Sequence, residues 1–283
     1  MLQAVLKTVA VASGALFFAG YLGAVHPAGD TLAVARLPLA VIFALAVIWT
    51  DWSAPARWVV SAAPITGLAH LAALAMVTAE PGPVTVYQKN LLFKNEETEA
   101  VMADIRAAAP DLVFLQEVSP TNRAALAELQ DLLPHQLVCD FTSWAKVAVL
   151  SRWPQAGEGV CVPGLAALPV ETPDGPGWAL SLHLHWPWPY QQPDHLESLA
   201  PTLAGLEGPV YVGGDFNMVP WGWSVRRVAA LTRTQRAGAA QRTVVKRGVP
   251  LSIDHVLAPG GGRTEVRPRF GSDHWGVLGQ VHR

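Results

Sequence analysis

Hydrophobic and polar positions divide this chain into two parts of different character. Apolar runs fill most of the first 79 residues, at about Ala4 to Val25, Leu32 to Trp49 and Trp58 to Val77. Each run is near the ~20 residues that a helix needs to cross the hydrocarbon core of a bilayer. The pattern therefore predicts three transmembrane helices within residues 1–79.

The first apolar run has two other interpretations. Lys7 precedes the run and the small residue Ala24 lies near its end, as in a cleaved secretory signal. A buried helical hairpin is the second alternative, but such a hairpin shows a polar face that these runs lack. Two more apolar runs follow directly, so a membrane region is the preferred interpretation.

Positive charge gives the expected orientation, because short cytoplasmic loops favour Lys and Arg. The bases of residues 1–79 are Lys7, Arg36 and Arg57, and the loop 26–30 has none. We place Lys7 and Arg57 on the cytoplasmic side, and Arg36 can snorkel from the second span to the interface. Three spans, an odd number, then leave the residues from 80 onward outside. We expect a multi-pass protein of the cell (inner) membrane with a periplasmic or extracytoplasmic domain.

A second domain is expected over residues 80–283. Glu80-Pro81-Gly82-Pro83 cannot continue a helix, and the ~200 residues that follow suit one domain with a full core. Period-2 and continuous apolar segments alternate with helical patterns. Strands are expected near 84–87, 112–115, 147–150, 179–184, 210–213, 252–258, 265–267 and 276–281, and helices over 96–108, 119–133 and from about 224.

Charge in the second domain is unevenly distributed. Residues 80–283 hold 17 Lys and Arg against 20 Asp and Glu, which excludes a generally basic nucleic-acid binder. Residues 226–269 nevertheless carry ten bases and two acids. These bases could hold phosphates beside an active site, or they could form a solvated face.

Cysteine usage leaves two possibilities. Cys139 and Cys161 are the only cysteines, so they could form one disulfide in an oxidising compartment or remain buried thiols.

Polar residues that suit phosphate-ester chemistry follow the predicted strands. Glu117 ends an apolar strand, and Gly214-Asp215-Phe216-Asn217 ends another in a tight turn. Hard divalent cations take oxygen ligands such as carboxylates. The terminal Ser272-Asp273-His274 adds an imidazole, the usual general acid or base near neutral pH.

Two more motifs complete the series: a His-bearing strand at Ser181-Leu182-His183, and Ile253-Asp254-His255 before the terminal motif. In this order the motifs resemble those of the endonuclease/exonuclease/phosphatase superfamily. That superfamily includes DNase I-like nucleases, sphingomyelinases and inositol-polyphosphate phosphatases. Val147–Leu150 followed by Ser-Arg-x-Pro resembles another of its signatures. The resemblance covers roughly residues 84–281. It implies a four-layer αββα sandwich of the α/β class, preceded here by the membrane helices.

The resemblance also implies roles for single residues. Glu117 would ligate the metal, Mg2+ or Mn2+, with Asn90 and Asp273 beside it. Asp215 would orient or activate the attacking water, and Asn217 would hydrogen-bond the phosphate. Asp273 could instead orient a histidine.

Histidines complete the set that the resemblance implies. His274 would hold the phosphate or pass a proton, and Asp254 would position that histidine. His183 is preferred over His185 as the upstream catalytic histidine because it ends the apolar strand. His255 is expected to be a packed neighbour. No motif identifies the residue that orients the upstream histidine, a Glu or a Tyr in known branches of the superfamily.

The chain is thus expected to be a membrane-anchored, metal-dependent hydrolase of phosphodiester or phosphomonoester bonds. Its expected partners are a phosphate-ester substrate and the lipid bilayer, and no protein partner is predicted. A nuclease could use the basic stretch, whereas a lipid phosphodiesterase could rest Trp186, Trp188, Trp221 and Trp223 at the membrane interface. A binding module that has lost catalysis is the remaining alternative.

Overall fold

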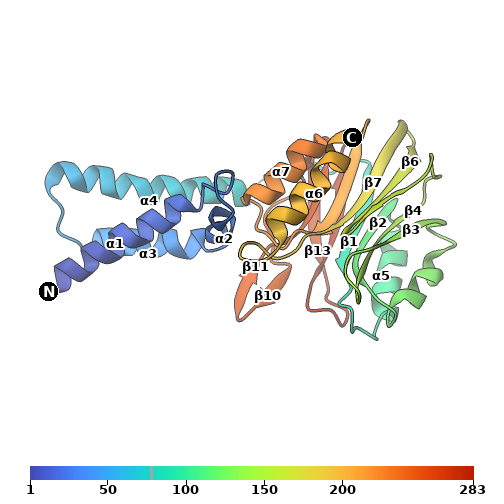
Figure 1. Cartoon of the computed structure of the whole chain (residues 1–283), viewed down its shortest axis with the longest axis horizontal. Coiled ribbons are helices and arrows are strands. Elements are labelled where there is room, and N and C mark those ends of the chain that lie inside the picture. Colours follow the sequence, from blue (N-terminus) through green and yellow to red (C-terminus); the bar gives the residue numbers. More distant parts are fainter. Residues whose placement is uncertain (77–78) are drawn as a thin grey trace.

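The computed structural model describes residues 1–76 and 79–283 and has an elongated shape, with a helical N-terminal part beside a layered α/β part (Figure 1). The helical part consists of α1 (Leu2–Ala19), α2 (Ala28–Val34), α3 (Arg36–Ile48) and α4 (Ala54–Ala75). The predicted third span therefore becomes α4, and its last predicted residue, Val77, lies outside the described residues.

The predicted second span is broken in two. Helices α2 and α3 meet at a bend of 71°. Arg36, at the bend, is buried; its guanidinium donates to the carbonyl of Gly20 and lies 3.9 Å from the centroid of the Tyr21 ring. Within residues 1–76 and 79–283, α1 is the one helix long and apolar enough to cross a membrane, and the bent pair would be a second candidate only if it forms one span.

Two six-stranded sheets form the second part. The first has the order β13-β14-β1-β2-β4-β3, with β1 (Val84–Asn90), β2 (Leu112–Val118), β3 (His135–Asp140), β4 (Lys146–Ser151), β13 (Gly262–Arg267) and β14 (Gly276–Val281). The second has the order β5-β6-β7-β8-β12-β9, with β5 (Val160–Val162), β6 (Leu165–Thr172), β7 (Gly175–His183), β8 (Val210–Asp215), β9 (Gln235–Arg236) and β12 (Asp254–Ala258). A hairpin of β10 (Val244–Lys246) and β11 (Val249–Leu251) stands apart.

Hydrophobic clusters show how the layers stack. Side chains of both sheets, among them Phe114 and Tyr211, share one buried cluster, so the sheets pack face to face. The outer face of the first sheet packs against α5 (Glu99–Ala108) and a 3-10 helix (Arg123–Leu129). The outer face of the second packs against α6 (Gln192–Gly205) and α7 (Trp223–Thr232). This is the expected αββα sandwich.

Strand direction brings the ends of the central strands to one edge of the sandwich. β1 runs parallel to β2 and β7 runs parallel to β8, while their other neighbours are antiparallel. Each parallel pair is joined through a helix, α5 or α6, as a crossover requires. The carboxyl ends of these four strands therefore lie together with the starts of β12 and β14.

Sequence patterns missed several elements. The helix expected over 119–133 is only the 3-10 helix Arg123–Leu129, and no helix was expected where α6 lies. Pro193 and Pro201 disguise α6, since Pro is tolerated in the first turn but removes a hydrogen bond inside a helix. Strands β3, β5 and β6 and the β10–β11 hairpin were also missed. Their alternation is weak, and pairing with neighbours gives them their conformation.

The structure resolves the cysteine alternatives in favour of a disulfide. Cys139 on β3 and Cys161 on β5 are bonded, with their Cα atoms 5.3 Å apart. β3 is an edge strand of the first sheet and β5 of the second. The disulfide therefore joins the two sheets at their edges.

Candidate active site

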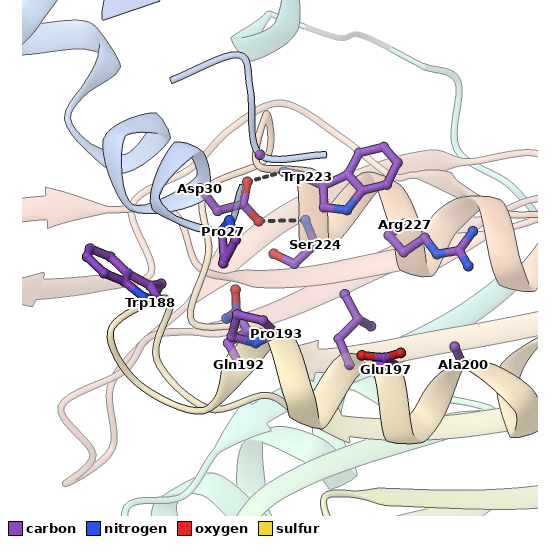
Figure 2. A pocket seen from close by; sticks show the side chains of 12 residues that line it. Pro27, Asp30, Trp188, Gln192, Pro193, Glu197, Ala200, Trp223, Ser224 and Arg227 are labelled. Atoms are coloured by element: carbon purple, nitrogen blue, oxygen red, sulfur yellow. Dashed lines mark hydrogen bonds between the residues drawn. The ribbon is translucent and has the colours of Figure 1, made fainter. Parts of the chain in front are cut away.

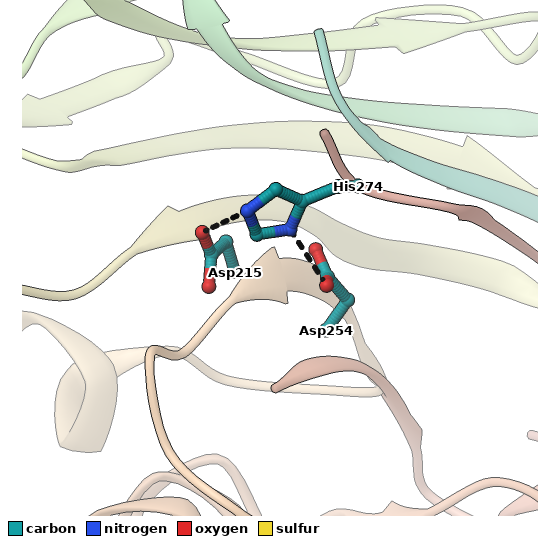
Figure 3. A group of neighbouring side chains, drawn as sticks. All are labelled: Asp215, Asp254 and His274. Carbon is teal, nitrogen blue, oxygen red and sulfur yellow. Dashed lines mark hydrogen bonds and ion pairs between the residues drawn. The ribbon is translucent and has the colours of Figure 1, made fainter. Parts of the chain in front are cut away.

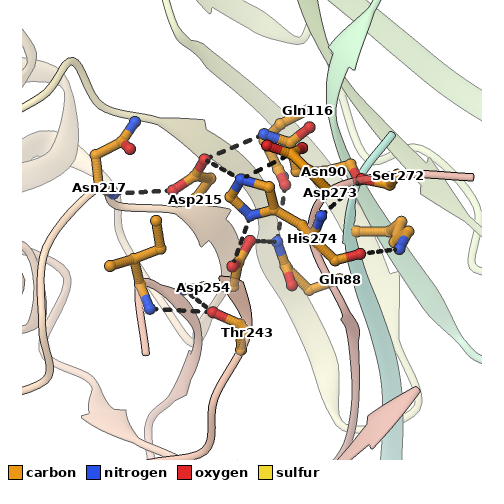
Figure 4. Close-up of polar contacts among 12 residues, drawn as sticks. Gln88, Asn90, Gln116, Asp215, Asn217, Thr243, Asp254, Ser272, Asp273 and His274 are labelled. Carbon is orange, nitrogen blue, oxygen red and sulfur yellow. Dashed lines mark hydrogen bonds and ion pairs between the residues drawn. The ribbon is translucent and has the colours of Figure 1, made fainter. Parts of the chain in front are cut away.

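Polar side chains gather where the central strands end (Figure 4). Asn90 ends β1, Glu117 lies near the end of β2, His183 ends β7 and Asp215 ends β8. Asp254 begins β12 and pairs in register with Asp215. Residues far apart in the sequence thus meet because parallel strands and their antiparallel neighbours share one edge.

Asp215 lies at the centre of the group. Its Oδ2 accepts a hydrogen bond from the side-chain amide of Asn90 at 3.1 Å and lies 3.5 Å from Nε2 of His183 and 3.8 Å from Nε2 of His274. Its Oδ1 accepts the backbone N–H of Asn217 at 2.9 Å. Burial raises the pKa of Asp215 to about 7, against the opposing effect of His274. The carboxylate is therefore more basic than an ordinary aspartate.

His274 is fixed by a second carboxylate. Its Nδ1 lies 2.9 Å from Oδ2 of Asp254, and Nε2 faces Asp215 (Figure 3). Burial of the ring by itself lowers the pKa, but the attraction of Asp254 and Asp215 outweighs it and raises the pKa to about 9. His274 therefore holds its proton at neutral pH.

The two upstream histidines differ in position. His183 is buried and its Nε2 faces Asp215, whereas His185 is half-buried further along the chain. Both rings pack on Phe141, with centroids 4.5 and 4.7 Å away. Within the described residues Nδ1 of His183 is buried without a hydrogen-bond partner, and burial lowers the pKa of this ring to about 3. Among the described residues no carboxylate or tyrosine bonds this Nδ1, and the ring packs on Phe141 instead.

Two of the predicted residues have strained backbones. Glu117 has φ of 54° and Asn217 has φ of 49°, in the left-handed region that non-glycine residues seldom adopt. Glu117 lies where the register between β2 and β4 shifts, at a bulge. Such bulges and outliers redirect side chains at functional sites. Asn217 here donates to the carbonyl of Leu184 at 2.8 Å.

The three predicted metal ligands are only partly brought together. Glu117 Oε1 accepts from the amide of Asn90 at 3.0 Å, so these two are direct neighbours. Oδ1 of Asp273 lies 3.9 Å from Nε2 of His274, the nitrogen that also faces Asp215. Its Oδ2 binds Lys246 at 2.7 Å. Asp273 is therefore a neighbour of the histidine.

The acidic side chains fit a divalent cation. Asp215, Asp254 and His274 offer ligand atoms that all lie within 4.8 Å of one another. Both oxygens of Asp254 are already engaged, however, by His274 and by Gln88 at 3.0 Å. Glu117 and Asp215 instead line the open pocket. Oxygen donors facing a pocket suit a hard cation better than the inward Asp254 does.

A buried polar network supports the site, and sequence reasoning missed it. Gln88 connects Asp254 to Gln116, which donates to Ser181 at 3.0 Å between the sheets. Thr243 accepts the backbone N–H groups of residues 253 and 254. Gln116 follows four apolar residues of β2, and this polar residue in an apolar strand was the one available signal.

Lys89 holds the loop that carries His274. Its ammonium group is fully buried and donates to the carbonyl of His274 at 2.6 Å and of Arg269 at 2.8 Å. Ser272 adds two contacts, to the carbonyl of Asn90 and from the N–H of His274. The loop is therefore tied to the end of β1.

A pocket of about 270 Å3 opens over these groups. Its polar wall is formed by Glu117, His183, Asp215, Asn217 and His274, and its outer wall by Phe141, Trp144, His185, Trp186 and Lys246. The site thus combines acids and histidines at its base with aromatic rings at its entrance.

Comparisons with known proteins agree with this architecture. The sequence model of the Endonuclease/Exonuclease/phosphatase family matches residues 88–274 of this chain. Beta toxin from Staphylococcus aureus, in a mutant structure with bound magnesium ions, is similar at 12% identity and a TM-score of 0.59 over 70% of this chain and 99% of that one.

Two more solved structures are similar. An endonuclease/exonuclease/phosphatase family protein from Leptotrichia buccalis has 12% identity and a TM-score of 0.57, covering 71% of this chain and all 100% of its own. Truncated Caenorhabditis elegans TDP2 has 19% identity and a TM-score of 0.54, covering 69% and 96%. No curated protein matches the chain significantly. At these identities the structures support the fold.

Proposed function

Because the chain belongs to the Endonuclease/Exonuclease/phosphatase family of phosphate-ester hydrolases, we propose that it is a membrane-anchored, divalent-metal-dependent phosphoesterase with the site described above. One observation carries the proposal: His183 and His274 converge on the same carboxylate oxygen of Asp215. The pocket around them is also lined by Glu117. These groups supply the base, the proton donors and the cation ligand that hydrolysis needs.

Asp215 acts on the attacking water. Its raised pKa makes it a competent base near neutral pH, since a base is most effective when its pKa lies near the working pH. Asn217, on the adjoining turn, can exchange its bond to Leu184 for one to a phosphoryl oxygen. Water held by Asp215 would thus attack in line with the leaving group.

The histidines stabilise charge on the phosphoryl group. The His274 ring is protonated at both nitrogens, because its pKa is raised. Nδ1 donates to Asp254, so Nε2 can donate towards the pocket. His183 is neutral because it is buried, and it can donate one hydrogen bond. Preorganised donors of this kind stabilise the charge that develops on the equatorial oxygens.

Glu117 and Asn90 are the proposed holders of Mg2+ or Mn2+, with Asp273 nearby as a further acidic group. Bound there, the cation would polarise a phosphoryl oxygen and neutralise charge on the leaving oxygen. Asn90 now donates its amide to Glu117. To present its oxygen to a cation, the amide would have to turn and give up its bond to Asp215 and the N–H of Leu92 that its oxygen now accepts at 2.9 Å.

We propose further that the helical part is a multi-pass membrane region that leaves the catalytic domain on the extracytoplasmic side. Helix α1 would be one span, and α3 and α4 would be the other two, packed beside it, while α2 lies against the catalytic domain. Of the described helices, only α1 is long and apolar enough to be a span by itself. The disulfide between Cys139 and Cys161 supports an oxidising compartment. Residues 1–79 and 80–283 would then be the membrane and catalytic domains.

The pocket favours a substrate with a small phosphorylated headgroup, such as a phospholipid, over a nucleic acid. Among the seven bases between positions 226 and 247, only Lys246 lines the pocket. Others are engaged elsewhere: Arg233 bonds the carbonyl of Leu206, and Arg242 stacks on Trp275.

Tryptophans also divide between two roles. Trp186 and Trp188 are 37% and 45% exposed, whereas Trp221 is half-buried against the helical part and donates to the carbonyl of Ala33 at 2.7 Å. Trp186 lines the pocket and suits a membrane interface, whereas the ring of Trp188 lies against His26 of the helical part. Trp221 and its neighbour Trp223 instead pack at the junction between the two parts.

Turnover by the full chain in detergent micelles tests the proposal. Product release would be measured with Mg2+, Mn2+ or EDTA on duplex DNA, RNA, sphingomyelin and phosphoinositide. We expect cleavage of one lipid substrate that needs the cation and falls by about 10³-fold or more in Asp215→Ala. The exposed Asp174→Ala is the matched control and should retain activity.

Two outcomes would contradict the proposal. Full metal-dependent activity in a folded Asp215→Ala protein would remove Asp215 from the mechanism. Cleavage of DNA or RNA that weakens steeply with salt, without turnover of lipids, would replace the lipid substrate by a nucleic acid.

A further inference from the structure

The short helix α2 connects the helical part to the catalytic domain at one buried residue. Asp30 is only 6% exposed, and its carboxylate accepts the backbone N–H groups of Trp223 and, at 2.9 Å, of Ser224 (Figure 2). These are the first two residues of α7. Gly222, which precedes them, has no side chain and cannot cap the helix.

Asp30 thus caps a helix of another part of the chain. The first N–H groups of a helix have no partner within it, and a side-chain oxygen at its start normally supplies one. A negative charge there is also favoured by the helix dipole. α7 therefore has its first turn satisfied by a residue almost 200 positions away in sequence.

Other contacts of α2 reach the two loops that border the active site. Trp221 donates its indole N–H to the carbonyl of Ala33 at 2.7 Å, and Thr31 donates to the carbonyl of Trp188. Trp221 belongs to the loop 216–222, which carries Asn217. Trp188 follows the pocket residue Trp186. α2 therefore touches both loops.

The loop 216–222 is anchored at its two ends and also in its middle, where the carbonyl of Met218 lies 2.8 Å from Nε2 of His255. At its inner end Phe216 donates its N–H to the carbonyl of Ile253, and Asn217 bonds Asp215. At its outer end the anchors are Trp221 and the start of α7, and both depend on α2. Removing the contacts of α2 would free the outer half of the loop.

Close packing leaves Asp30 little freedom. A Cβ atom added at Gly23 would lie 2.6 Å from Oδ1 of Asp30 and 2.8 Å from Cβ of Trp223. Both distances are shorter than van der Waals contact. Gly23 is therefore required where the chain passes between the carboxylate and α7.

We propose that Asp30 is a positioning residue for the active site, which holds the loop 216–222, and with it Asn217, through the start of α7. The helical part would then be a structural support of the catalytic domain as well as its anchor. The role assigned to Asn217 rests on the proposed function, whereas the support of the loop does not.

Hydrogen exchange of the full chain in micelles tests the proposal. We expect Asp30→Ala to raise the exchange rate of peptides covering 216–224 by roughly tenfold, which corresponds to the loss of one helix cap. The exchange rates of strands β1 and β14 should stay unchanged. Asp30→Asn keeps an oxygen acceptor without the charge and should restore part of the protection. Asp51→Ala, at the exposed acid of the same region, is the matched control.

Enzymatic activity provides a second, independent measurement. On the substrate cleaved by the native chain, kcat should fall several-fold in Asp30→Ala at nearly constant KM, with recovery in Asp30→Asn. Gly23→Ala, which displaces Asp30 without removing it, should give the same pattern if Asp30→Ala does not fold.

The outcomes separate this inference from the proposed function. Unchanged exchange at 216–224 in Asp30→Ala and Gly23→Ala would overturn it, and so would an equal increase throughout the catalytic domain, which indicates general destabilisation. Absence of turnover in the native chain would contradict the proposed function alone. Faster local exchange in the variants would still support the role of Asp30.

Discussion

Asp254 and His274 belong to different sheets and meet with Oδ2 and Nδ1 2.9 Å apart. Asp254 begins β12 in the second sheet, and His274 lies two residues before β14 in the first. The pair therefore spans the interface between the sheets. It fixes which ring nitrogen of His274 faces Asp215, and the geometry of the site depends on how the sheets are stacked.

Asp254→Asn should impair catalysis through His274. An asparagine keeps the shape but removes the charge that holds the proton on the ring. We expect kcat to fall by about 10²- to 10⁴-fold, the range found when general acid–base catalysis is lost. NMR titration of the metal-free protein should show the His274 pKa near 9 in the native chain and clearly lower in the variant. Equal values in the two proteins would rule out this pairing.

Glu117→Gln should weaken metal binding, because an amide oxygen is a poorer ligand for a hard cation than a carboxylate. Calorimetric titration with Mg2+ or Mn2+ should give at least a roughly tenfold higher Kd. Glu158→Gln, at an exposed position away from the pocket, serves as the control. Unaltered affinity in Glu117→Gln would favour Asp215, Asp254 and His274 as the ligand set instead.

Buried His255 should make stability depend on pH. Its Nε2 lies 2.8 Å from the carbonyl of Met218, and burial lowers its pKa to about 4. A pKa below the ordinary value means that the folded state resists protonation, so its stability is complete above pH ~6.5 and declines as pH falls towards 4. The decline is at most about 3 kcal/mol from this residue.

Urea unfolding at pH 7 and pH 5 measures this effect. His255→Gln should lose stability at pH 7 with the contact to Met218, yet lose less than the native chain between the two pH values. A pH dependence as steep in the variant as in the native chain would show that other groups cause it.

Loss of the disulfide should destabilise the domain. Cys139 and Cys161 close a loop of about 22 residues between the edges of the two sheets. Replacing both with serine should lower the free energy of unfolding by about 3 kcal/mol. Thermal unfolding with and without a reductant provides the check: the reductant should lower the Tm of the native chain and leave that of the double variant unchanged.

Sequence patterns predicted the layered fold and most of its strands. β14 occupies the predicted residues, and β1 begins at the predicted Val84, because both strands have strong apolar patterns. The αββα arrangement came from the resemblance and is confirmed. By contrast α6 was hidden by its prolines, and β3 and β5 owe their conformation to pairing and to the disulfide between them.

The sequence by itself determined which residue types are present and their order along the chain. Glu117, His183 and Asp215 each follow an apolar segment and His274 precedes one, so local propensity suffices to place them beside strand ends. Tertiary structure alone decided their distances. The pairing of Asp254 with His274 and the cap that Asp30 gives to α7 join residues from separate elements. Such contacts arise when sheets and helices pack, and no short-range pattern encodes them.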